Sequence, residues 1–194
     1  MRPGTILLAF AVVATVQVLV PAGMIAQREA TLRYGHPYKF RTAPVDPYDA
    51  FRGRYVWLGY EQNHARWNGN AEVTMRSRAY ALVQKGPDGF AVIDSVGLEP
   101  PKTGDYVKVI QVYRDWQAKS ANSVVHFNLP FDRYYMEETA ASQAEREYWQ
   151  QGNRRGQTNH NTYVVVRIRD GDAVLENLFV DGRPISEFVK QSAK

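Results

Sequence analysis

The stretch TYVVVRIRDGDAVLENLFV, Thr162 to Val180, contains two runs rich in β-branched residues, separated by a single Asp-Gly pair. Such residues favour the extended conformation of a strand. Asp170-Gly171 between the runs is a strong signal for a two-residue type I′ turn, in which both central residues need a positive φ angle. The stretch therefore predicts an antiparallel β-hairpin.

Earlier segments of the chain have the same extended character. The run Ala71–Gln84 alternates between apolar and polar positions, which is typical of a strand with one solvent-exposed face. The turn cluster KGPDG, Lys85–Gly89, joins it to the next apolar run and predicts a second hairpin. The segments predicted to be strands are Arg54–Glu61, Ala71–Gln84, Phe90–Asp94, Tyr106–Tyr113 and Val124–Phe131.

One segment, Glu137–Gln150, predicts a short soluble helix, because two glutamates open it and small apolar residues form a stripe along it. Together with the strands it indicates a β-rich α+β fold. We expect an N-terminal transmembrane helix followed by a twisted antiparallel sheet or an open barrel with one short helix.

Near the amino terminus, TILLAFAVVATVQVLVPAGMIA at Thr5–Ala26 runs for about 22 residues without a charge. A helix of that length crosses a hydrocarbon core of about 30 Å. The segment fits a retained anchor, and it also fits a cleaved signal peptide with a small-residue cleavage site at Val20-Pro21-Ala22. Because a signal core usually has only about 7–15 apolar residues, the anchor is favoured.

The orientation of this span follows only in part from its flanks. Arg2 precedes it while Arg28 and Arg33 follow it, so the positive-inside rule assigns no side. The signal-like shape favours a single pass with the C-terminal domain outside the cytoplasm. The predicted boundaries are a transmembrane anchor or uncleaved signal segment at 1–30, a polar linker at 31–43, an exported domain at 44–188 and a tail at 189–194.

Composition and motifs exclude several kinds of site. The chain has no cysteine, which removes disulfides, thiol nucleophiles and cysteine metal ligands. Its histidines show no metal-ligand spacing, and it contains no P-loop, G-x-S-x-G, H-E-x-x-H or dinucleotide-binding motif. With a net charge of only +4, an exported domain is not expected to bind nucleic acid. No cofactor, no metal and no catalytic residue is assigned.

A first candidate binding site lies in PVDPYDAFRGRYVWLGY, Pro44 to Tyr60. Acids and arginines gather in its first half, and aromatic rings that can stack on a sugar or a peptide follow. The alternative is a proline-containing turn whose acids bond to the backbone, followed by aromatic residues of the core. The candidate residues are Asp46, Asp49, Arg52, Arg54, Tyr55, Trp57 and Tyr60.

A second polar cluster, DRYYMEE, lies between a predicted strand and the predicted helix. Exposed N–H groups at a helix start can bind an anion, but an acid of the cluster can also cap the helix internally. If a pocket exists, we expect it where this cluster meets the first one. The candidate binding residues here are Asp132, Arg133, Tyr135, Glu137 and Glu138.

The residues GRYVWLGY in the first cluster resemble the signature of the bacterial GDYXXLXY family. Gly53, Tyr55, Leu58 and Tyr60 match it, whereas Arg54 replaces the signature aspartate. An acid–base role for position 54 is therefore not expected in this chain.

Two later motifs, LPFDRYYMEE at Leu129–Glu138 and VDGRPI at Val180–Ile185, resemble the same family, so that the resemblance extends from about Pro44 to Ile185. It implies a membrane-anchored protein of the bacterial cytoplasmic membrane, of uncharacterised function, in a family with some members associated with multi-spanning membrane proteins. It implies no catalytic residue.

We therefore expect a non-enzymatic, membrane-tethered module that contacts the lipid bilayer and binds an integral membrane protein or another envelope component. The alternative is an envelope hydrolase that uses acids of the two clusters and needs two carboxylates at one cleft, about 5–9.5 Å apart in a glycosidase. A structural accessory domain without a ligand is the third hypothesis. The acids available to a hydrolase are Asp46, Asp49, Asp132, Glu137 and Glu138.

Overall fold

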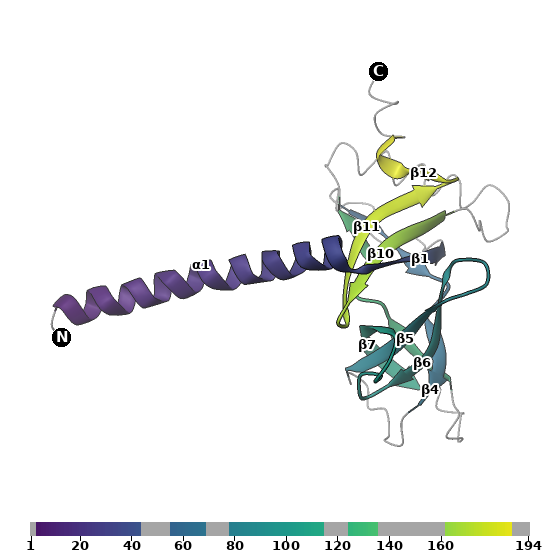
Figure 1. Cartoon of the computed structure of the whole chain (residues 1–194), viewed down its shortest axis with the longest axis horizontal. Coiled ribbons are helices and arrows are strands. Elements are labelled where there is room, and N and C mark those ends of the chain that lie inside the picture. Colours follow the sequence, from purple (N-terminus) through teal and green to yellow (C-terminus); the bar gives the residue numbers. More distant parts are fainter. Residues whose placement is uncertain (1–2, 44–54, 69–77, 115–123, 136–161, 188–194) are drawn as a thin grey trace.

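One long helix, α1, projects from a body of β-strands in which a sheet lies on one side of the inner end of the helix and a small barrel lies on the other (Figure 1). This arrangement confirms the β-rich fold class with an N-terminal apolar helix. The predicted helix at Glu137–Gln150 lies outside the described residues. The computed structural model describes residues 3–43, 55–68, 78–114, 124–135 and 162–187.

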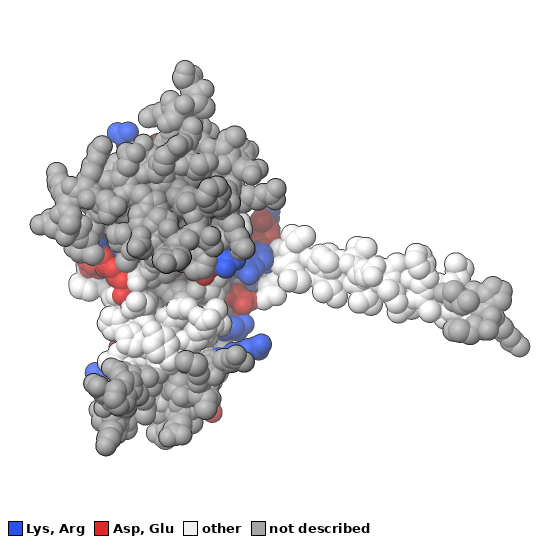
Figure 2. Space-filling view, turned by 180° about the vertical axis from the view of Figure 1, so that it is seen from behind, with Lys and Arg blue, Asp and Glu red and all other residues white. Residues whose placement is uncertain are grey.

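Helix α1 (Pro3–Tyr34) contains the apolar stretch that the sequence singles out. Its large apolar side chains between Leu7 and Ile25 are 52–71% exposed, and the helix is uncharged along most of its length (Figure 2). A helix that is apolar on all sides needs an apolar surrounding. The segment Leu7–Tyr34 is long and apolar enough to cross a membrane, and proline is tolerated in such a helix.

The linker predicted at 31–43 is wrong. Helix α1 continues to Tyr34, and after Gly35 the chain enters strand β1 (His36–Ala43) directly. Alternate residues of β1, Tyr38, Phe40 and Thr42, are buried, so the polar residues between them are the outer face of a strand. Polar composition alone suggested a linker, whereas the period-two pattern indicates the strand.

Strand β1 lies inside a five-stranded antiparallel sheet of order β12-β11-β10-β1-β3. The predicted C-terminal hairpin is confirmed, because β10 and β11 pair and Arg169 faces Asp172 across the turn. Both turn residues have positive φ, 52° at Asp170 and 82° at Gly171, as a type I′ turn requires. The other strands of the sheet are β3 (Gly59–Tyr60), β10 (Thr162–Arg169), β11 (Asp172–Val180) and β12 (Arg183–Pro184).

The second part is a closed five-stranded barrel of order β4-β6-β5-β7-β8. It closes because β4 pairs with β8 on one side and, in parallel, with β6 on the other. The predicted alternation is confirmed where it is described, since Ala79, Ala81 and Val83 are buried inside the barrel. The barrel strands are β4 (His64–Trp67), β5 (Ala79–Lys85), β6 (Ala91–Gly97), β7 (Asp105–Arg114) and β8 (Val124–Asn128).

The sheet and the barrel are joined by polar contacts at the hairpin turn and at β1. The backbone N–H of Lys108 donates to the carbonyl oxygen of Gly171 at 3.1 Å. The Asp105 carboxylate lies 2.7 Å from His36 Nδ1 and accepts a hydrogen bond from the Tyr38 hydroxyl at 2.9 Å. Buried residues of both parts form one continuous hydrophobic core, so the β body behaves as a single packed unit.

The Tyr38–Asp105 contact predicts a pH dependence of stability. Burial, and then the hydrogen bond to Asp105 and its charge, raise the pKa of Tyr38 to about 12. Because the folded pKa lies above the unfolded one, the contact stabilises fully below about pH 10 and its contribution is lost as pH rises towards 12. Tyr38→Phe should abolish this decline in urea-unfolding free energy. An unchanged decline in the variant would contradict the assignment.

Candidate binding site

The structure brings the two predicted clusters together. Strand β2 (Tyr55–Trp57), from the first cluster, pairs antiparallel with β9 (Arg133–Tyr135), from the second. Tyr55 faces Tyr135, and Trp57 faces Arg133. We call this two-stranded element the β2–β9 ribbon. Two hollows lie next to the ribbon. From the sequence, any pocket was expected where the two clusters meet.

Residues next to the ribbon attach it to the body. The Leu58 N–H donates to the Asp132 carbonyl at 2.8 Å, and the Tyr60 hydroxyl donates to the Phe131 carbonyl at 2.6 Å. The Tyr60 ring packs edge-on against Phe40 and Phe131, with centroids 6.2 and 5.3 Å away. Tyr60 is only 8% exposed, so its proposed role as a binding surface is corrected to one in the core.

The smaller hollow has a volume of about 180 Å³ and lies where residues 58–63, at the end of the first cluster and just after it, meet residues 127–132, which lead into the second cluster. It is lined by apolar and amide side chains together with Asp132. The larger hollow, of about 610 Å³, lies between the ribbon and the base of α1. We call it the root groove, and its lining consists of Arg28, residues 130–135 and residues 173–176.

The charged groups of the root groove differ in how they are held. Arg28 Nη1 donates to the Ala173 carbonyl at 3.2 Å. The Glu176 carboxylate receives two hydrogen bonds from Arg167, at 2.7 and 3.2 Å. This bonding raises the pKa of Arg167, so Glu176 is held as half of a structural pair.

The second strand of the ribbon contributes the remaining groups. Arg133 Nε lies 3.8 Å from the nearer oxygen of Asp132, at the outer limit of an ion pair. Tyr134 turns inward, its hydroxyl bonds to Asn177 at 3.3 Å, and burial raises its pKa. Tyr135 points outward and is 66% exposed. The groove thus offers guanidinium groups and an aromatic ring at one surface.

Several predicted site residues cannot be placed in this site. The backbones of Tyr55 and Trp57 are placed by the ribbon, but their side chains are not described. Asp132 is thus the only one of the five proposed acids in the described part of the chain, and no carboxylate pair for a hydrolase is defined there. The residues outside the described ranges are Asp46, Asp49, Arg52, Arg54, Glu137 and Glu138.

The structure also adds residues that the sequence did not assign to a site. In the sequence, Arg28 was considered only as one of the charges that flank the apolar segment. In the structure it lines the groove. Its position just beyond an apolar stretch was the available signal, because basic residues there sit at a membrane surface. Glu176 and its partner Arg167 had no signal in the sequence, since they alternate with apolar residues along two ordinary strands.

Two of the scattered histidines lie side by side on the barrel. His64 and His126 are register partners on β4 and β8, and their ring centroids are 5.9 Å apart. The Tyr113 ring stacks on His126 at 5.2 Å. Within the described ranges, no group of three or more metal-ligating side chains is present, so this pair remains an aromatic surface contact.

The described part of the chain thus defines a β-domain protein, in which a sheet and a closed barrel follow an apolar helix that could span a membrane, with a ribbon and a groove near the base of that helix. The model of the GDYXXLXY protein family matches residues 17–178, and the chain belongs to this family. Comparison with curated proteins and with solved structures finds no match. The function of the family is uncharacterised.

The structure gives a physical reason for part of the family signature. Leu58 and Tyr60 are buried, and each binds the backbone of the segment that contains the second motif. The signature therefore holds one motif against the other. Its described positions, Leu58 and Tyr60, are packed in the core.

Proposed function

We propose that the protein is a membrane-tethered binding module, and that the β2–β9 ribbon contacts an integral membrane protein or another component of the cell envelope. The observation that carries this proposal is the position of the ribbon, whose strand β9 lines the groove at the base of the apolar helix. Tyr135 and Arg133 are presented there with exposed side chains. Aromatic residues and arginine are the residue types most enriched at binding hot spots.

The compartment is part of the same proposal. A single pass through the bacterial cytoplasmic membrane, with the β body outside the cytoplasm, is supported by the apolar α1 and by the signal-like shape of its sequence. A body on that side meets envelope components and the outer ends of other membrane proteins.

Binding is favoured over hydrolysis by the way the groove's acids are held. Glu176 has both oxygens committed to Arg167, and Asp132 uses its backbone to anchor Leu58. A general acid or base needs a proton-transfer position beside a substrate. The Glu176 carboxylate, with both oxygens bound by Arg167, does not offer such a position.

Site-specific photo-crosslinking in native membranes tests this function. A photoreactive phenylalanine replaces Tyr135 in the full-length chain, and a matched probe replaces exposed Lys102 on the barrel. We expect an adduct with a membrane or envelope component from position 135 alone, weakened by Arg133→Ala. Identical adducts from both positions, or none from position 135, would refute the proposal.

A further inference from the structure

We propose that the root groove binds the headgroup of an anionic phospholipid, with Arg28 as its main phosphate ligand. The inference rests on the membrane anchoring in the proposed function and names one ligand class for the same site. Three features support it: the level of the groove relative to the bilayer, the charge of Arg28, and the contacts that fix the base of α1.

The level of the groove relative to the bilayer follows from helix geometry. The uncharged stretch ends at Ala26, and α1 rises about 1.5 Å per residue. Arg28 therefore lies about 3 Å beyond the apolar stretch, whereas the headgroup layer on each side of a bilayer is about 5–8 Å thick. The groove lined by Arg28 thus opens at the level of the lipid phosphates.

Within the described residues, the charge of Arg28 is not compensated by an acid. Arg28 donates a hydrogen bond to the neutral carbonyl of Ala173, and no carboxylate of the described residues pairs with it. Arg33, one and a half turns further along α1, differs because its Nε bonds to Glu29 at 2.8 Å. A guanidinium with donors left over and no acid beside it is suited to bidentate binding of a phosphate.

The remaining lining favours an anion over a cation. The Glu176 charge is balanced by Arg167, and Asp132 lies beside Arg133. The lining itself holds two arginines and two acids, and with Arg167, which pairs with Glu176 from outside the lining, the groups around the groove carry one net positive charge. The exposed Tyr135 ring at the mouth is the kind of side chain that settles at a membrane interface.

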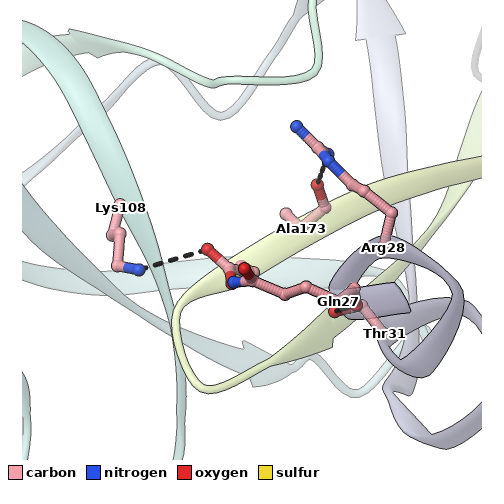
Figure 3. A network of polar contacts seen from close by, with 6 residues as sticks. Gln27, Arg28, Thr31, Lys108 and Ala173 are labelled. Carbon is pink, nitrogen blue, oxygen red and sulfur yellow. Dashed lines mark hydrogen bonds and ion pairs between the residues drawn. The ribbon is translucent and has the colours of Figure 1, made fainter. Parts of the chain in front are cut away.

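The base of α1 is fixed, so the groove exists before a lipid arrives. Gln27 bonds to Asp172, which Lys108 approaches from the barrel at 3.1 Å (Figure 3). Thr31, 2% exposed, is buried against the sheet. These contacts hold Arg28 beside β11, and such preorganisation reduces the entropy lost on binding.

The test is retention of lipid by the full-length chain, measured by native mass spectrometry after release from nanodiscs of equal phosphatidylglycerol and phosphatidylcholine. We expect preferential retention of one phosphatidylglycerol molecule. Each basic residue near an anionic surface contributes about 1 kcal/mol, so Arg28→Gln should weaken retention about fivefold. Arg133→Gln should weaken it in the same direction and provides a second test if the first variant unfolds.

The matched control is Arg66→Gln on the distant strand β4, which should leave retention unchanged. Equal retention of the two lipids, or retention unaffected by both groove variants, would overturn the lipid site. Displacement of the lipid by inorganic phosphate alone would also overturn it, because the ligand would then be a free anion. A crosslink from position 135 that survives such a result would leave the proposed function standing, so the two failures are distinguishable.

Discussion

Gly35→Ala is expected to lower the free energy of unfolding by about 2–3 kcal/mol and to loosen the base of α1. A Cβ atom at this position would lie 2.4 Å from the Thr31 carbonyl oxygen and 3.1 Å from that of Ile168. Both are backbone atoms, so neither can move without shifting the last turn of the helix or the β1–β10 register. The absence of a side chain is what allows a helix to pass directly into a central strand.

Gly97→Ala is the matched control for this substitution. Its added Cβ would meet nothing closer than 3.9 Å, and its φ angle is not in the left-handed region. Urea unfolding of the full-length chains in detergent, followed by tryptophan fluorescence, compares the two variants. Equal stabilities of Gly35→Ala and Gly97→Ala would show that the junction is not tightly packed.

Phe40→Ala is expected to destabilise the protein by about 3–5 kcal/mol, the usual cost of removing a buried aromatic ring. Phe40 is fully buried in β1. Its ring lies 5.1 Å from Phe131 and 6.2 Å from Tyr60. The cavity would lie next to Tyr60 and Phe131, which adjoin the ribbon. We therefore expect the substitution to reduce both the stability of the fold and binding at the ribbon.

Phe40→Leu separates packing from the aromatic ring itself. It keeps most of the buried volume, so it should cost less than about 1.5 kcal/mol. Thermal unfolding measures both variants. If Phe40→Ala lost no more stability than Phe40→Leu, β1 would not be part of the core, and its assignment as an internal strand of the sheet would be wrong.

Local patterns allowed much of the fold to be predicted. Asp170-Gly171 specified its turn because the turn chemistry is contained in two residues, and the alternation around Ala81 specified the inner face of a strand. The strand β1 was missed because Pro37 and its basic residues suggested a linker, while its burial depends on β10, more than a hundred residues later. Barrel closure through the parallel β4–β6 pair is equally non-local.

The site could be predicted only in part for the same reason. Each cluster was visible in the sequence, and their meeting was expected, but the pairing of Tyr55 with Tyr135 is a long-range contact. The groove also needs Arg28 from the helix and Glu176 from β11. No local pattern connects these positions, and the aromatic character of Tyr60 did not distinguish a core residue from an exposed one.

The central claim is that the docked base of α1 holds the root groove at the membrane surface. Because the chain has no cysteine, a single nitroxide label can be placed at Val174 in the groove or at Lys102 on the barrel. Depth-dependent electron paramagnetic resonance accessibility in lipid bilayers then compares the two. We predict that the label at 174 lies within about 8 Å of the hydrocarbon boundary, while the label at 102 stays in water. Equal water exposure of both labels would contradict it.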